Sequence, residues 1–225
     1  MSQASSALRT TARLLTFRAS TSELAALGKP ELTVGLIATW MVGMGRWWDD
    51  PEAHLLQHLG VGSLAYTFAL ALLLWLLIKP LRPEHWTYAG VLTFVSLTSP
   101  PAILYAIPVE RFMDLGAARQ VNVWFLAFVA AWRVGLLAFY LRRLARLPWY
   151  AVLVATFLPL TVIVTVLAVL NLERAVFDVM RGLQEQGTAA DEAYGVLLGL
   201  TALSTFLVGP FLLAYLFTWY ARRSR

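Results

Sequence analysis

Residues 56–78 read LQHLGVGSLAYTFALALLLWLLI, a run that contains no Asp, Glu, Lys or Arg. At about 1.5 Å per residue, a helix of this length covers the roughly 30 Å hydrocarbon core of a bilayer. No water is present there to bond backbone amides, so a helix, which bonds them internally, is the structure expected for an isolated apolar run. The stretch therefore predicts a membrane-spanning helix.

Five further stretches of the sequence are also predominantly apolar. The composition agrees, since 59% of the 225 residues are hydrophobic and only 14% are charged, whereas a soluble domain carries about a quarter charged residues. The first window is the shortest, and a re-entrant or tilted helix there would leave five full crossings. The sequence predicts an all-α, polytopic bundle of about six spans, at residues 32–48, 56–78, 86–107, 121–141, 149–170 and 193–220.

Basic residues are distributed unevenly over the predicted loops. Twelve of the 18 lie in the N-terminal segment, the loops after spans two and four, and the tail, whereas ten of the 13 acidic residues lie on the opposite side. The positive-inside rule then places both termini in the cytoplasm, most simply at a bacterial inner or plasma membrane. Five spans would separate the basic tail from the basic N-terminal segment, so the distribution favours six.

Three parts follow from this layout: a cytoplasmic amphipathic segment (1–31), a transmembrane domain (32–220) and a basic cytoplasmic tail (221–225). The basic excess predicts contact with anionic lipid headgroups on the cytoplasmic face. Nucleic acid is not an expected partner, because the short loops give no surface that could cover a duplex.

The N-terminal segment contains a basic amphipathic helix. Its apolar residues recur at helical spacing beside Arg9 and Arg13, which is typical of a helix on a membrane surface. Ser20 and Glu23 form a capping box, and Gly28 is expected to end the short helix that follows. The segment is either an anchor for the first span or a docking site for a partner or lipid. The apolar stripe consists of Ala4, Leu8, Ala12, Leu15 and Ala19.

A cluster of acids and histidines lies between the first two spans. His54 and His58 are four residues apart, so on a helix they share a face, a spacing that metal sites use. Asp49, Asp50 and Glu52 could complete the coordination shell. The alternative is structural, because Asp50 is a good N-cap and acids in the first turn complement the helix dipole.

Arg133 lies near the centre of the fourth predicted span. Burying an arginine there costs about 2.5–3.5 kcal/mol on insertion scales, so it should face the bundle interior or water. No predicted span contains an Asp or Glu to pair with it. It is therefore a structural arginine bonded to carbonyls freed by a proline, a site for a substrate or lipid phosphate, or a side chain that snorkels to the interface.

The third span is interrupted by Thr98, Ser99, Pro100 and Pro101. Each proline removes an amide donor and frees a carbonyl about four residues earlier, so this helix cannot be straight. The two hydroxyls can bond the freed groups. Broken helices near the midplane form binding sites in secondary transporters, but isolated prolines in membrane helices are also commonly structural.

Small residues mark possible helix-packing faces. Gly35 and Gly43 in the first span, and Gly195 and Gly199 in the sixth, would allow close approach of another helix. They could also support a homo- or hetero-oligomer.

Several chemistries lack the residues they require. The chain has no cysteine, which excludes disulfides and thiolate sites. It has no P-loop, no histidine deep in a span to hold haem and no intramembrane carboxylate pair. We predict no catalytic residue and no cofactor.

In layout, over most of its length, the chain resembles the bacterial members of the Yip1-like family of small multi-pass membrane proteins. The resemblance implies an organising or trafficking-type role without catalysis, and it assigns no functional residue. It rests on Thr16-Phe17-Arg18 before a helix ending at Pro30, a small-residue-rich first span, the Pro100-Pro101 break, and Trp132-Arg133 in a span with a basic exit.

The leading hypothesis is thus a non-enzymatic membrane scaffold or interaction protein. The alternative is a small transporter or channel with a site near Arg133 and the Pro100-Pro101 break. A membrane enzyme ranks third, since it would need His54 and His58 to converge with acids on a metal.

Overall fold

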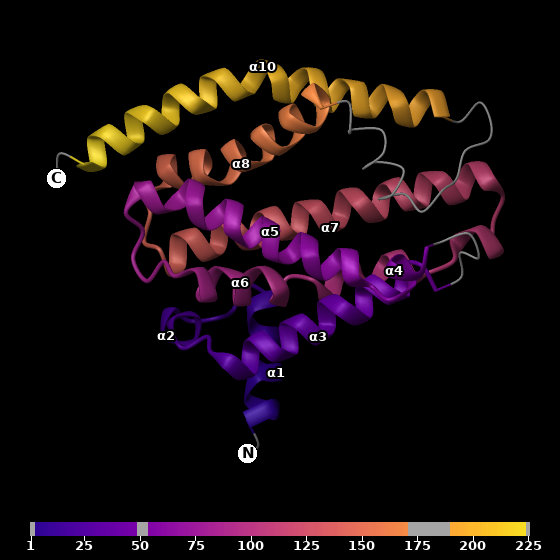
Figure 1. The fold of residues 1–225 in the computed structure, drawn as a ribbon, viewed down its shortest axis with the longest axis horizontal. Coiled ribbons are helices and arrows are strands. Elements are labelled where there is room, and N and C mark those ends of the chain that lie inside the picture. The colour runs from indigo at the N-terminus through magenta and orange to yellow at the C-terminus, as the bar shows by residue number, and fades with distance from the viewer. Residues whose placement is uncertain (1–2, 49–53, 171–189, 224–225) are drawn as a thin grey trace. The chain divides into compact units, whose positions relative to one another are not determined.

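The computed structural model describes residues 3–48, 54–170 and 190–223, and within these ranges every regular element is a helix. The all-helical prediction is confirmed for this part of the chain. Two units, residues 1–148 and 149–225, are described separately (Figure 1). The first contains α1 (Gln3–Leu15), α2 (Thr21–Ala25), α3 (Lys29–Gly45), α4 (Leu55–His58), α5 (Val61–Ile78), α6 (Tyr88–Leu97), α7 (Leu115–Arg143) and the 3₁₀ helices η1 (Lys79–Leu81), η2 (Pro100–Ala106) and η3 (Val109–Arg111); the second contains α8 (Trp149–Val169) and α10 (Ala190–Arg223).

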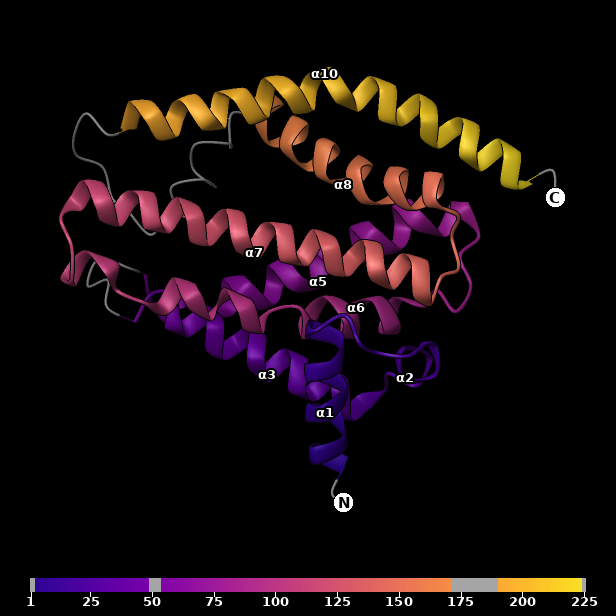
Figure 2. The same cartoon turned by 180° about the vertical axis from the view of Figure 1, so that it is seen from behind.

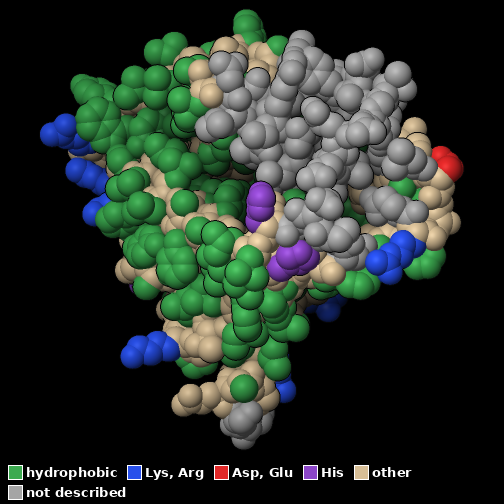
Figure 3. Space-filling view, turned by 45° about the vertical axis from the view of Figure 1, so that its right-hand side comes forward, with side chains coloured by type: hydrophobic (Ala, Val, Ile, Leu, Met, Phe, Trp, Pro, Cys, Tyr) green, Lys and Arg blue, Asp and Glu red, His purple; other side chains and the backbone are tan. Residues whose placement is uncertain are grey.

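Four stretches are long and apolar enough to cross a membrane, and they lie in α5 with η1, α7, α8 and α10. The pair α6 and η2, bent by 42°, would make a fifth. Hydrophobic side chains dominate the surface seen in Figure 3. Large apolar residues on these helices are exposed, among them Leu76 at 52% and Phe206 at 76%. Lipid is the solvent that suits such surfaces, so the protein has the form of a multi-pass membrane protein.

Helix α3 is shorter than the other candidates. It has 17 residues and begins with Lys29, Pro30 and Glu31, so its apolar part rises only about 21 Å. Pro30 stands in the first turn of α3, where proline is favoured, rather than behind a preceding helix as expected. Full crossing by this segment, and with it the count of six spans, stays a prediction.

The second predicted span is interrupted near its start. Residues 55–58 form the single turn of α4, and the long helix α5 begins only at Val61, because Gly60 adopts a left-handed conformation with φ 65°. A Cβ on Gly60 would lie 2.8 Å from the Trp40 carbonyl oxygen and 2.9 Å from the Met44 backbone nitrogen. Only glycine fits this close approach to α3.

The small residues of α3 line one buried face. Gly35, Thr39 and Gly43 are all buried, and α3 packs against both α5 and α6. A Cβ on Gly35 would overlap the Ser96 hydroxyl, and a Cβ on Gly43 would lie 2.7 Å from the Ser63 Oγ. Glycine at these positions therefore lets α3 approach both neighbours closely.

Helix α1 packs on α3 through a face that differs from the predicted stripe. Its buried residues are Ala7, Thr11 and Leu14, whereas Leu8 in the stripe is 59% exposed. The helix stands at a steep angle to α3 in both ribbon views (Figures 1 and 2). Ala4, Leu8 and Ala12 of the stripe are thus exposed, where a membrane surface could meet them, whereas Leu15 is half-buried and Ala19, beyond the end of α1, is buried.

The segment after α1 is fastened to α7 by Phe17. This residue has a φ of 59°, and its ring lies 6.0 Å from the Trp132 ring and 5.8 Å from the Phe139 ring. Trp132 also donates from its indole nitrogen to the Leu15 carbonyl oxygen at 3.1 Å. The N-terminal arm, defined here as residues 3–28, is therefore attached to the transmembrane helices.

In the second unit α8 and α10 lie side by side and run in opposite directions (Figures 1 and 2). Phe157 stacks on Phe211 with ring centroids 5.8 Å apart. Each helix continues through an internal proline, Pro159 or Pro210. Spans five and six are thus helices close to their predicted limits.

We expect Gly35→Ala to destabilise the first unit, because the new methyl group would overlap Ser96. Overpacking of this kind costs about 1–3 kcal/mol and would lower the midpoint of thermal unfolding in detergent. Gly62→Ala in α5 is the control, since a Cβ there meets nothing within 4 Å. Equal stability of the two variants would contradict the close packing of α3.

Candidate functional site

The strongest candidate site is the break between α6 and η2. Helix α6 ends at Leu97 with Thr98 as its C-cap, and η2 starts at Pro100 after a bend of 42°. The expectation that the third helix is not straight is confirmed. Two consecutive prolines cannot supply the amide donors that would continue an α-helix.

The side chains at the break bond to one another and to α3. Thr98 donates to the Val95 carbonyl oxygen at 2.7 Å, and Ser96 donates to Thr93 O at 2.9 Å. The Ser99 and Thr39 hydroxyls lie 2.7 Å apart, and Thr39 also bonds the Ser96 carbonyl oxygen at 3.3 Å. These hydroxyls thus hold the break to α3.

Arg133 reaches the same break from α7. Its Nε donates to the Thr98 Oγ1 at 3.3 Å, and the side chain is half-buried. The structure therefore brings Arg133, Thr98 and the Pro100 break together, as the sequence suggested. Thr98 accepts from the arginine while donating to its own helix, since a hydroxyl can donate one bond and accept others.

Carboxylates with described side chains do not pair with Arg133. Glu31 and Asp114 cap the starts of α3 and α7, Glu84 pairs with Arg146, and Glu23 lies in the N-terminal arm. The counterion for this guanidinium is thus not among these four acids.

Two further polar residues near the break were not singled out from sequence. Arg46, the C-cap of α3, lies with its Cζ 5.6 Å from the centroid of the Tyr105 ring and 5.6 Å from that of Trp47. The signal that points to Tyr105 is chemical, since it is the only residue between Pro101 and Ile107 whose side chain can hydrogen-bond.

The two histidines lie at the two ends of α4. His54 is the N-cap of α4 with extended φ and ψ of −67° and 153°, and α4 ends at His58 after a single turn. The His58 backbone N–H donates to the His54 carbonyl oxygen at 3.1 Å, so the two residues are one turn apart, and a metal site there stays a prediction. Asp49, Asp50 and Glu52 lie outside the described residues. Among described side chains, no three of His, Asp or Glu converge as metal ligands.

The glycine faces have different surroundings. Gly35 and Gly43 are buried against α6 and α5. A Cβ on Gly199 would meet nothing within 4 Å, so this residue packs against no other part of the described chain. Gly195 lies outside the residues whose surroundings are described.

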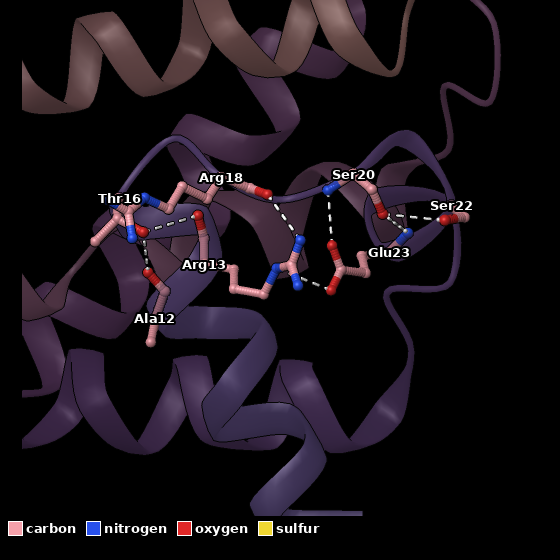
Figure 4. Close-up of polar contacts among 7 residues, drawn as sticks. All are labelled: Ala12, Arg13, Thr16, Arg18, Ser20, Ser22 and Glu23. Atoms are coloured by element: carbon pink, nitrogen blue, oxygen red, sulfur yellow. Dashed lines mark hydrogen bonds and ion pairs between the residues drawn. The ribbon is translucent and has the colours of Figure 1, made fainter.

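The N-terminal arm carries a second polar group (Figure 4). Glu23 Oε2 accepts from the Ser20 backbone N–H at 2.7 Å, and the Ser20 Oγ accepts from the Glu23 N–H at 3.2 Å, which confirms the capping box. Glu23 Oε1 lies 3.1 Å from Arg13 Nε, and Arg13 also donates to the Arg18 carbonyl oxygen at 3.1 Å. Hydrogen bonds from Ser20, and then the charge of Arg13, hold the pKa of Glu23 below its ordinary value. These contacts order the arm, but exposed ion pairs contribute little to stability.

No protein-family model, characterised protein or solved structure matches this chain. The break and the N-terminal arm are the two parts of the described chain whose geometry bears on function.

We expect Thr98→Val to destabilise the first unit by about 1–2 kcal/mol, since it removes the acceptor for Arg133 in a place without water. Thr98→Ser keeps the hydroxyl and should retain most of the stability. A double-mutant cycle with Arg133→Met, measured by thermal unfolding in detergent, isolates the pair. Additive effects of the two substitutions would show that the bond contributes nothing.

Proposed function

We propose that the chain is a non-enzymatic integral membrane protein that acts as a scaffold or interaction partner. The observation that carries this proposal is that the buried hydroxyl groups at the helix break form their hydrogen bonds within the protein. Thr39, Ser96, Thr98 and Ser99 are each under 5% exposed, and their hydroxyls bond groups within α3 and α6. A transport site needs polar groups that a solute can reach, so this arrangement favours a structural role. The same role is what the Yip1-like resemblance implies.

We further propose six spans, with α3 as the first and both termini in the cytoplasm of a bacterial cell. Contacts at one end of the first unit support this. The Glu84 backbone N–H donates to Ala145 O at 3.2 Å, and Thr21 Oγ1 lies 3.5 Å from the Arg143 carbonyl oxygen. The loop after α5 therefore contacts the loop after α7, and the N-terminal arm contacts the end of α7. All three segments are basic, as a cytoplasmic face requires.

Anionic lipid headgroups are the partner that this end suits best. Exposed cations there would attract the negative surface of the cytoplasmic leaflet, and the outward stripe of α1 could enter the headgroup layer beside them. The exposed basic residues of the two loops are Lys79, Arg82, Arg142, Arg143 and Arg146.

Helix α10 supplies the surface on which we place protein contacts. Between Gly199 and Arg223 its only buried residue is Thr218, whereas Leu213 is 69% exposed and Phe217 is 73% exposed. A homo- or hetero-oligomer through this face, including the open position at Gly199, would suit a scaffold.

Transport is the second candidate, and one observation favours it. Arg133 places a cation at a broken helix, an arrangement that secondary transporters use for solutes. A transporter would expose this site to one side of the membrane during its cycle.

The topology can be tested directly, because the chain has no cysteine to remove. We expect a membrane-impermeant maleimide to label Phe112→Cys in intact cells, since this residue follows η3 on the outer side. Ala4→Cys, His85→Cys and Arg223→Cys should react only after permeabilisation. External labelling of Arg223→Cys would show an odd number of crossings and overturn the six-span proposal.

The functional class is tested by flux and cross-linking together. Purified protein in proteoliposomes should pass inorganic anions and cations no faster than protein-free vesicles. A photo-crosslinking residue at Phe217 should give an adduct of defined mass in cell membranes, while the buried position Thr218 should give none. Flux above the vesicle background that is lost in Arg133→Gln would contradict the scaffold and establish transport.

A further inference from the structure

The N-terminal arm runs along the last turn of α7. At one end of this contact the Phe17 ring lies 5.8 Å from the Phe139 ring, and at the other end the Thr21 Oγ1 lies 3.5 Å from the Arg143 carbonyl oxygen. Because residues 17–21 are held to this turn at both ends, Arg18 lies beside it. The two stretches, residues 17–21 and 139–143, are together called the arm junction.

Two exposed arginines belong to the arm junction, Arg18 from the arm and Arg143 from α7. The Arg143 Cζ lies 5.6 Å from the centroid of the Phe139 ring, which is the same ring that Phe17 contacts. A guanidinium above an aromatic ring keeps its N–H donors at its edges, where an acceptor can bind them. The two cations are therefore placed on one patch by a shared aromatic contact.

The described acids on this side of the protein are engaged elsewhere. Glu23 lies 3.1 Å from Arg13, and Glu84 is paired within the loops. Among the side chains that the structure describes, no carboxylate forms an ion pair with Arg18 or Arg143. The arm junction therefore presents positive charge at its surface.

The arm junction lies where lipid headgroups are expected. The candidate span in α7 ends at Arg143. Phe17 is 39% exposed although its ring contacts α7, and Leu8 on α1 is 59% exposed. Helix α1 stands at a steep angle to α3 (Figures 1 and 2), which suits a helix lying in the plane of the membrane. Exposed aromatic and apolar side chains beside arginines are typical of the membrane–water interface.

We propose that the arm junction binds the phosphate of one anionic phospholipid of the cytoplasmic leaflet, held between Arg18 and Arg143. This inference rests on the proposed contact with anionic headgroups and gives that contact a defined place. Arginine binds phosphate oxygens through charge-assisted hydrogen bonds, and the two non-bridging oxygens of a phosphodiester can accept from both guanidinium groups. A lipid suits the site better than free phosphate, because Phe17 and Leu8 offer acyl chains an apolar surface that a soluble ion does not need.

Phe17 is a positioning residue for this site. Its φ of 59° lies in the left-handed region, which is rare for a bulky side chain. The ring sits over Gly135 of α7, where a Cβ would lie 3.4 Å from the Phe17 Cζ. Contacts with α7 thus hold a backbone conformation that is unfavourable by itself. Without the ring, residues 17–21 should leave α7, and the two arginines would separate although no charge is lost.

Binding can be measured on the full chain in detergent by native mass spectrometry. Phosphatidylglycerol is the anionic probe, and phosphatidylcholine, which carries the same phosphodiester without net charge, is the comparison. We expect one phosphatidylglycerol to bind saturably, about tenfold more tightly than phosphatidylcholine. Inorganic phosphate should not displace it.

Arg18→Gln and Arg143→Gln should each weaken this binding roughly tenfold, the scale of losing a charged hydrogen bond. Arg143→Lys should weaken it less, because the charge remains but the planar donors are lost. Phe17→Ala should also weaken it, at unchanged net charge. Arg9→Gln is the matched control, since Arg9 is exposed on α1 about two turns before the arm junction and should bind like the wild type.

Four results would overturn the site. They are equal binding of the two lipids, wild-type affinity in the folded glutamine variants, wild-type affinity in folded Phe17→Ala, and an equal loss in Arg9→Gln, which would show that binding reports only net charge. Displacement of the lipid by inorganic phosphate would instead assign the arginines to a soluble anion. Thermal unfolding verifies the fold of each variant, and Arg18→Gln decides if the others do not fold. None of these results bears on the scaffold, which flux and cross-linking test separately.

Discussion

The bent third span depends on the close approach of α3. In a bilayer, a carbonyl that loses its amide partner at a proline has no water to bond, so a double proline needs hydroxyls from nearby. Thr39 on α3 supplies one of them, since its hydroxyl donates to the Ser96 carbonyl oxygen at 3.3 Å and lies 2.7 Å from the Ser99 hydroxyl. This contact is possible because Gly35, one turn earlier on the same face, has no side chain to hold α3 away from Ser96. A glycine on one helix therefore makes a break on another tolerable, and the bend then determines where η2 and Tyr105 lie.

The same face of α3 also organises the start of the second span. Gly43 lies against Ser63, and the left-handed turn at Gly60 lets the chain pass close to the α3 backbone. Two tryptophans fix the C-terminal end of α3 and the residues just after it, since Trp40 donates to Leu59 O at 2.8 Å and Trp48 donates to Ala106 O at 2.9 Å. Helix α3 is short for a span, but it is packed between α5 and α6. Its place in the bundle thus rests on contacts with protein, whereas the long exposed helices need only length and an apolar surface.

The contrast between a helix held by protein contacts and helices exposed to lipid explains which parts of the structure could be predicted from the sequence. The long helices follow from apolar runs, because a lipid-facing span requires composition and length but no particular partner. The break follows from its two prolines, whose effect on the backbone is local. The interruption between α4 and α5 depends on how closely Gly60 approaches α3. The pairing of Arg46 with Tyr105 and the packed face of α1 likewise depend on segments far apart in sequence. Local patterns carry no information about such contacts.

Arg133 ties α7 to the same break. Its Nε donates to the Thr98 Oγ1 at 3.3 Å, and Thr98 in turn donates to the Val95 carbonyl oxygen at 2.7 Å. One hydroxyl thus joins the end of α6 to a side chain of α7, while Thr39 joins the neighbouring residues Ser96 and Ser99 to α3. The break is therefore held from two sides, which gives α7 a defined place against the bent pair α6 and η2, as the proposed scaffold requires.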